Sequence, residues 1–149
     1  MYTPFTVTLY NAETDPITLA VSHNITTLEG VFLDISKAAH IEKTGLSDSD
    51  GVTLFIPSSV KATDPTTGAV KQYLDPKAYH GLSTKTGYWT LEAGGKDSSL
   101  DCFFVKGTVV STNGYKYLRE NYDYVFDVTT VDIRDFGSPN MHHWQVGAR

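Results

Sequence analysis

The 149-residue sequence has little cysteine: Cys102 is the only one. A single cysteine excludes an internal disulfide and any cysteine-based zinc finger. Cys102 lies in an apolar stretch, residues 100–105, where a free cysteine usually behaves as a small buried hydrophobe. We therefore interpret it as a structural residue and not as a catalytic thiol.

Long apolar runs are also absent. No run approaches the roughly 20 residues that a membrane-spanning helix requires. A secretory signal begins with a basic residue followed by an apolar stretch, and residues 1–5 do not begin such a pattern. The sequence therefore predicts a protein that is made in the cytoplasm and has no membrane partner.

The sequence has no basic cluster, and its net charge is -5. A conventional nucleic-acid-binding protein carries a Lys/Arg stripe that neutralises phosphates, so this class is disfavoured. No nucleophile elbow, P-loop or paired-histidine zinc motif is present. His142 and His143 are adjacent, and neighbouring residues of a strand point to opposite faces, so they are poorly placed to share a metal ion. We expect no enzymatic activity, no catalytic residues, no metal and no cofactor.

The dominant pattern in the sequence is an alternation of apolar and polar residues. Apolar residues occupy every second position in several segments that turn signals separate, which is typical of short strands with one buried face. The clearest rows are Phe5, Val7 and Leu9; Ile17, Leu19 and Val21; Val31, Leu33 and Ile35; and Val52, Leu54 and Ile56. The pattern predicts one all-β domain over residues 1–149, a small antiparallel β-barrel or sandwich with a long loop and at most one short helix.

Two segments do not follow this alternation. Residues 58–71 are polar and small with turn residues in the middle, and they predict a long mobile loop, with a plain surface hairpin as the alternative. The loop residues that we select as candidates are Ser58, Lys61, Asp64, Thr67 and Lys71. Residues 113–123 place Tyr115, Leu118 and Tyr122 at helical spacing, which fits a short helix or a tyrosine-bearing loop.

The last twenty residues read as a strand, a Gly-Ser-Pro turn and a strand anchored by an aromatic residue. Asp132, Arg134, His143 and Trp144 are the candidate interface or barrel-end residues there. With Val131, Gly137, Ser138 and Val146, they resemble the C-terminal pattern of small head-to-tail connector proteins of tailed bacteriophages. The resemblance extends through residues 30–32, 52–57, 73–76 and 104–107, and so covers most of the chain.

The resemblance implies a non-enzymatic virion protein of the head-completion or stopper type. It implies a homo-oligomeric ring in the neck of the virion, assembled in the host cytoplasm. The ring would contact a portal-adaptor ring and tail proteins, and DNA would pass through its channel without sequence-specific binding. By the same resemblance, residues 58–71 would face the DNA channel or an adjacent ring.

Two alternatives remain open at this stage. The first is another virion protein, a tail-tube or tail-terminator subunit. The second is a glycan-binding module, because the nine tyrosines are suited to a carbohydrate platform as well as to protein interfaces.

Overall fold

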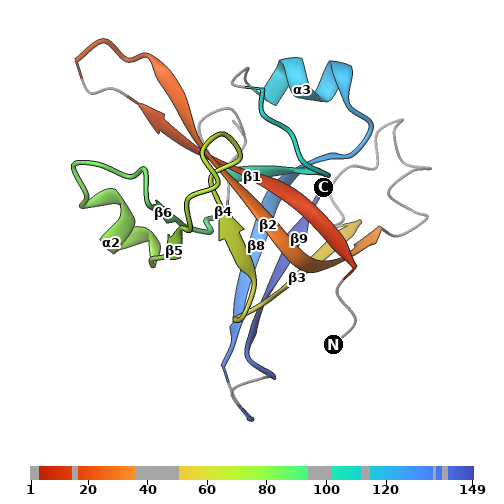
Figure 1. Ribbon diagram of the computed structural model, residues 1–149. Helices are drawn as coiled ribbons and strands as arrows, with labels where there is room; N and C mark the ends of the chain where they lie inside the picture. Colours follow the sequence, from red (N-terminus) through yellow and green to blue (C-terminus); the bar gives the residue numbers. More distant parts are fainter. Residues whose placement is uncertain are drawn as a thin grey trace.

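The structure is a computed structural model that describes residues 4–14, 17–35, 51–93, 102–111, 115–135, 137–138 and 141–149. Its strands are β1 (Phe5–Thr14), β2 (Val21–Ile35), β3 (Val52–Pro57), β4 (Lys61–Thr63), β5 (Gln72–Tyr73), β6 (Tyr88–Trp89), β7 (Cys102–Lys106), β8 (Val125–Arg134) and β9 (His143–Ala148) (Figure 1). Its helices are α2 (Pro76–His80) and α3 (Tyr115–Asn121).

Six strands close an antiparallel barrel in the order β1, β7, β8, β9, β3 and β2, and β2 pairs back onto β1. Strand β4 extends the sheet at the edge of β2. The predicted all-β class and the small antiparallel barrel are therefore confirmed. The helix content differs from the prediction, because the described residues contain two short helices where we expected at most one. Pro76, at the first turn of α2, has the fixed φ that suits a helix start.

Strand β2 is long because a bulge bends it into both halves of the barrel. The register with β1 skips Gly30, since Phe5 pairs with Val31 and Thr6 pairs with Glu29. Gly30 has a φ of 87°, a conformation that glycine adopts without strain. Residues 30–32 therefore lie inside one long strand.

The alternating rows of β1, β2 and β3 fill the inside of the barrel. Val7, Leu9, Leu28 and Leu54 are fully buried there, and Cys102 is 1% exposed, as expected for a structural cysteine. A second apolar cluster lies on the outer face of β1, β7 and β8. It forms where α3 covers the strands with Leu118, which is fully buried. Of the two readings of residues 113–123, the helix is thus the one found for residues 115–121.

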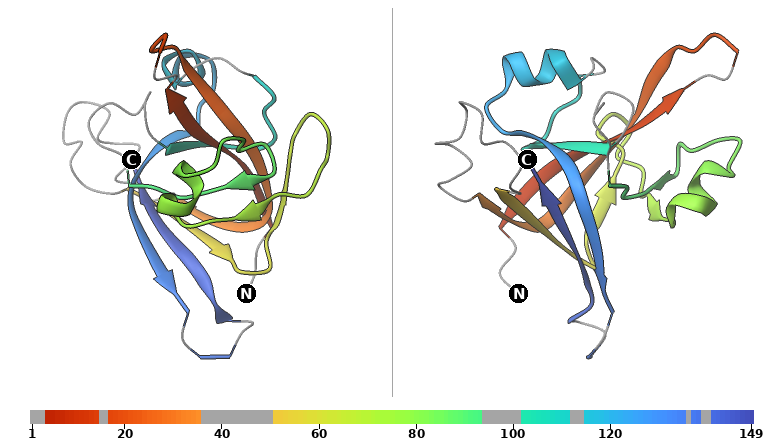
Figure 2. Two further views of the ribbon diagram at one scale, coloured as in Figure 1. Left: turned by 90° about the vertical axis from the view of Figure 1, so that its left-hand side faces the viewer. Right: turned by 180° about the vertical axis from the view of Figure 1, so that it is seen from behind.

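One end of the barrel is covered by what we call the cap, residues 72–89, which contains β5, α2 and β6. The left view of Figure 2 shows the cap lying across the ring of strands. Strands β5 and β6 pair with each other in parallel and form a separate two-stranded sheet. Trp89 of the cap is 2% exposed, and its ring centroid lies 5.0 Å from that of Tyr73 and 5.5 Å from that of Trp144. This aromatic plug joins the cap to the barrel core.

Candidate assembly surfaces

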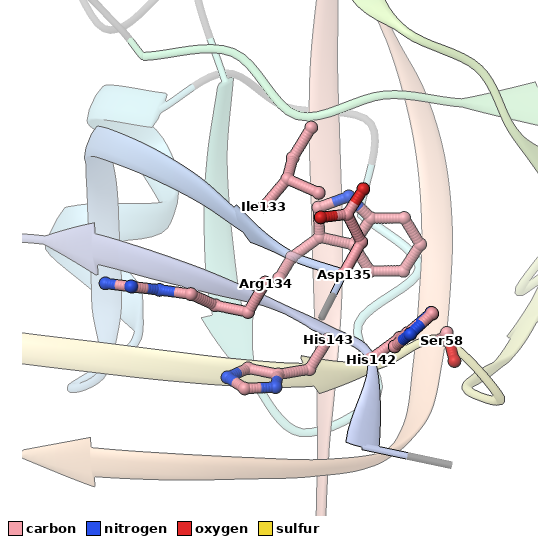
Figure 3. A pocket seen from close by; sticks show the side chains of 7 residues that line it. Ser58, Ile133, Arg134, Asp135, His142 and His143 are labelled. Atoms are coloured by element: carbon pink, nitrogen blue, oxygen red, sulfur yellow. The ribbon is translucent and has the colours of Figure 1, made fainter. Parts of the chain in front are cut away.

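The hairpin of β8 and β9, which we call the terminal hairpin, projects from the barrel and carries a pocket near its end. In Figures 1 and 2 the hairpin extends downward past the other strands. The pocket encloses about 140 Å³. Figure 3 shows its lining residues, which are Ser58, Ile133, Arg134, Asp135, His142, His143 and Trp144.

The pocket unites residues from two separate sequence predictions. Arg134, His143 and Trp144 were expected at an interface or barrel end, whereas Ser58 was assigned to the loop of residues 58–71. Ser58 joins them because it directly follows β3, and β3 pairs with β9 up to Pro57 and His143. The Ser58 amide also donates a hydrogen bond to the His142 carbonyl (2.9 Å).

Charged groups at the pocket are paired only loosely. The nearest Arg134 and Asp132 atoms, Nη2 and Oδ2, are 3.9 Å apart, and the two side chains are 41% and 59% exposed. An exposed pair of this kind stabilises a protein by about 0–1 kcal/mol. Asp132 and Arg134 are thus a surface pair beside the pocket, and they do not form a buried acid/base site.

The two histidines lie differently from the prediction. His142 precedes β9 and is not part of the strand, so the two side chains need not point to opposite faces, and both imidazoles line the pocket. Figure 3 shows the rings pointing in different directions. His142 Nε2 donates to the Gly137 carbonyl (3.3 Å), and His143 Nδ1 donates to the Met141 carbonyl (3.0 Å). Among the described residues, no group of three or more His, Cys, Asp or Glu side chains is placed to hold a metal ion.

The indole of Trp144 connects the pocket to the core. Trp144 packs against the barrel core, and its ring centroid lies 4.5 Å from that of Tyr73. The structure therefore places Trp144 at a barrel end, with its other side exposed in the pocket.

Residues 58–71 do not form the predicted long loop. Residues 61–63 form β4 and pair with β2, and Thr63 forms a bridge with Val70. Asp64 Oδ1 accepts hydrogen bonds from the amides of Thr66 (2.8 Å) and Thr67 (3.2 Å), which closes a tight turn. Partial burial opposes ionisation of Asp64, but these amides and Lys71 outweigh it and lower the pKa of the carboxyl. The segment is therefore a hairpin, the alternative that the sequence also allowed.

The other loop candidates occupy distinct environments. Lys61 is exposed and lies 3.6 Å from Glu29 in a surface ion pair. Thr67 lies exposed in the turn, where its hydroxyl accepts from the Ala69 amide. Lys71 is only 5% exposed and so cannot face a channel or a second ring. Its burial follows from β4, which places the preceding residues against β2.

Lys71 belongs to a buried polar network that the pattern of residues 58–71 does not predict. Its ammonium donates to Asn24 Oδ1 (2.8 Å), the Ile25 carbonyl (2.8 Å) and Thr26 Oγ1 (3.1 Å). The Asn24 amide group in turn contacts three oxygens of the cap. These acceptors are Tyr79 Oη (3.0 Å), the Lys85 carbonyl (3.0 Å) and the Tyr88 carbonyl (2.8 Å).

A second asparagine holds Thr90, the residue that directly follows the cap. Asn11 pairs with Asn24 across β1 and β2, and its Nδ2 donates to the Thr90 carbonyl (2.9 Å). Asn11 continues the inward row of Val7 and Leu9 on β1, and Asn24 lies on the same face of β2 as Leu28. A polar residue at the end of an apolar row was the signal that the sequence offered.

The burial of Lys71 predicts an unusual dependence of stability on pH. Desolvation lowers the pKa of Lys71 from 10.5 to about 8, against the opposing carboxylates of Asp64 and Glu13. Between these values the unfolded chain binds more protons than the folded one, so the free energy of unfolding should rise from pH 8 toward pH 10. Burial also raises the pKa of Tyr10 and of Tyr73 to about 12. Above pH 10, Tyr10 and Tyr73 therefore lose their phenolic protons more readily in the unfolded chain than in the folded protein. The free energy of unfolding should fall in this range.

Urea unfolding of the wild type and of Lys71→Met at pH 7, 8, 9, 10 and 11 tests this prediction. We expect the rise between pH 8 and 10 in the wild type only, and the fall above pH 10 in both proteins. If the free energy of unfolding changed equally with pH in the two proteins between pH 8 and 10, Lys71 would have its ordinary pKa.

A second projecting feature is the arm, residues 12–23, the part of the β1–β2 hairpin beyond the barrel. In the described part of the chain, β7 pairs with residues 7–11 of β1, whereas β1 and β2 remain paired to Thr14 and Val21. Ile17, Leu19 and Val21 are 89%, 72% and 41% exposed. The prediction that this row faces a core is therefore wrong, because the hairpin extends past the described strands of the barrel.

Comparison with known proteins gives a family of unknown function. A family model described as "Family of unknown function (DUF6751)" matches residues 2–149. The searches of curated proteins and of solved structures gave no match. Neither α2 nor α3, the helices of the described part of the chain, has the length and apolar composition needed to cross a membrane.

Proposed function

We propose that this chain, which belongs to the DUF6751 family, is a non-enzymatic structural subunit of a tailed-phage head-to-tail connector, of the head-completion or stopper type. The observation that carries the proposal is a closed barrel with two hairpins that project to opposite sides and expose apolar side chains (Figures 1 and 2). The resemblance of the sequence to connector proteins supports the same class.

Exposed apolar side chains at both projecting ends favour an assembly role. The arm exposes Ile17 and Leu19, and the terminal hairpin exposes Ile133 and Met141 by 54% and 60%. Apolar groups gathered at protruding positions usually mark a contact with another protein. A rigid barrel with one such contact on each side has the form needed by a ring subunit that touches its neighbours.

The net charge of -5 fits a ring that surrounds DNA without gripping it. A channel wall poor in Lys and Arg repels phosphate and lets a duplex slide. In this proposal the ring lies in the virion neck between a portal-adaptor ring and the tail. Because Trp89 and Trp144 fill the barrel end, DNA would pass through the centre of the ring and not through any single barrel.

A glycan-binding module is the second candidate, and exposed tyrosines favour it. Tyr117, Tyr122 and Tyr124 are 46%, 40% and 36% exposed on or next to α3. Lys106 Nζ lies 5.1 Å from the centroid of the Tyr124 ring. A glycan module should bind sugars as a monomer. A tail-tube subunit, the other virion alternative, should stack with copies of itself.

The test is to delete the gene in the phage or prophage that encodes the chain and to restore it in trans. We expect DNA-filled heads that leak and lack tails, and tailed infectious particles after complementation. Cryo-electron microscopy of complemented particles should show the chain as a ring at the neck. Normal tailed particles without the chain would refute the proposal, and a position along the tail would favour the tube alternative.

A further inference from the structure

The tip of the arm presents branched aliphatic side chains in an exposed position. Ile17 and Leu19 of the arm are 89% and 72% exposed. The paired residues 12–14 carry the tip about 10 Å beyond the last residue that β7 pairs with, at roughly 3.4 Å per residue. The arm can therefore reach a surface that the barrel itself does not touch.

The pocket of the terminal hairpin offers a matching space. Its volume is about 140 Å³, and Ile133 and Trp144 supply apolar wall. An apolar cavity of about 150 Å³ accommodates a benzene molecule. One branched aliphatic side chain therefore has a suitable size for this pocket.

The positions of the two features determine whose arm can enter. Both views of Figure 2 and Figure 1 show the arm and the terminal hairpin on opposite sides of the molecule. A chain therefore cannot place its own arm in its own pocket. Contact between unlike surfaces of two copies is heterologous, and such contacts close into rings when the rotation between copies allows it.

Charge contributes little to this contact. Residues 12–22 include the acidic residues Glu13 and Asp15 and have no Lys or Arg. An acidic arm can approach the guanidinium of Arg134, which is only loosely paired with Asp132 at 3.9 Å. Asp135 also lines the pocket and offsets part of this attraction. The apolar fit must therefore carry most of the contact.

We propose that the arm tip of one copy inserts Ile17 or Leu19 into the terminal-hairpin pocket of a second copy. This inference rests on the proposed ring and names the contact between its subunits. Burial of a single aliphatic side chain is a small stabilisation compared with the cost of associating two molecules. The purified protein should accordingly associate weakly, and neighbouring rings would be needed to hold the assembly together.

Disulfide trapping tests this contact in the full-length protein. Ile17→Cys of one copy, mixed with tagged Ser58→Cys under mild oxidation, should give a mixed dimer. The native Cys102 is 1% exposed and should remain unreactive. Ile17→Cys mixed with Thr66→Cys, an exposed turn position, is the matched control for random collision.

We expect the Ile17–Ser58 pair to cross-link several-fold faster than the control pair. Adding Leu19→Ser to the Ile17→Cys chain should slow the cross-linking, whereas adding the exposed substitution Lys116→Ser should not. Equal rates for the Ser58 and Thr66 partners would overturn the contact. In that case, particles that still require the chain at the neck would leave the proposed function intact. Fast cross-linking of a chain absent from particles would instead refute the function alone.

Discussion

Trp89→Ala should lower the free energy of unfolding by about 3–5 kcal/mol, the usual cost of deleting a large buried aromatic side chain. Trp89 is 2% exposed and contacts Tyr73 and Trp144 at the end of the barrel. Its removal leaves a cavity between the cap and the core that rigid strands cannot fill. Urea unfolding followed by far-ultraviolet circular dichroism measures the change.

Tyr117→Ala is the matched control, since Tyr117 is also aromatic but 46% exposed. Its effect should stay within about 0.5 kcal/mol. A loss below about 1 kcal/mol for Trp89→Ala would mean that the cap does not pack on the barrel as described, because a buried aromatic rarely costs so little.

Asn24→Ala should destabilise the protein by at least about 3 kcal/mol. The change removes an acceptor of the Lys71 ammonium and the donor to Tyr79 Oη and two cap carbonyls. A hydrogen bond to a charged group contributes about 1.5–3 kcal/mol, and each buried group left unsatisfied costs about 1–3 kcal/mol more. Chemical denaturation at pH 7 gives the value.

A double-mutant cycle separates the network from simple packing loss. Asn24→Leu with Lys71→Met removes the charge together with its acceptor, so the double variant should lose less than the sum of the single variants. Additive losses would show that Lys71 and Asn24 stabilise the fold independently. Ser22→Ala, at an exposed position of the same strand, should change little.

Alternation predicted the all-β class because it reports which side of a strand is apolar, but it left both a barrel and a sandwich open, and the pairing of β2 with β1 closes the barrel. The rows of Val7 and Leu9 and of Leu54 and Ile56 all face the interior. The same pattern over Ile17, Leu19 and Val21 gave the wrong environment, since periodicity does not say whether a neighbouring strand is present to cover the row. Local spacing predicts a face, but only the tertiary pairing determines its burial.

The candidate surfaces were predictable in part for a related reason. Arg134, His143 and Trp144 are close in sequence through one hairpin, and local reading brought them together. Ser58 reaches them through the pairing of β3 with β9, a contact between segments far apart in the chain. The burial of Lys71 likewise depends on β2, which no property of residues 58–71 reveals.

The position of the two tryptophans determines what an optical experiment on this protein observes. Trp89 and Trp144 are the only two in the chain, and they touch each other where the cap meets the barrel. The cap has its own small sheet and is joined to the barrel by side chains, so it can undock while the barrel persists. Tryptophan fluorescence therefore reports on the contact between the cap and the barrel end, whereas far-ultraviolet circular dichroism reports on the strands of the whole barrel.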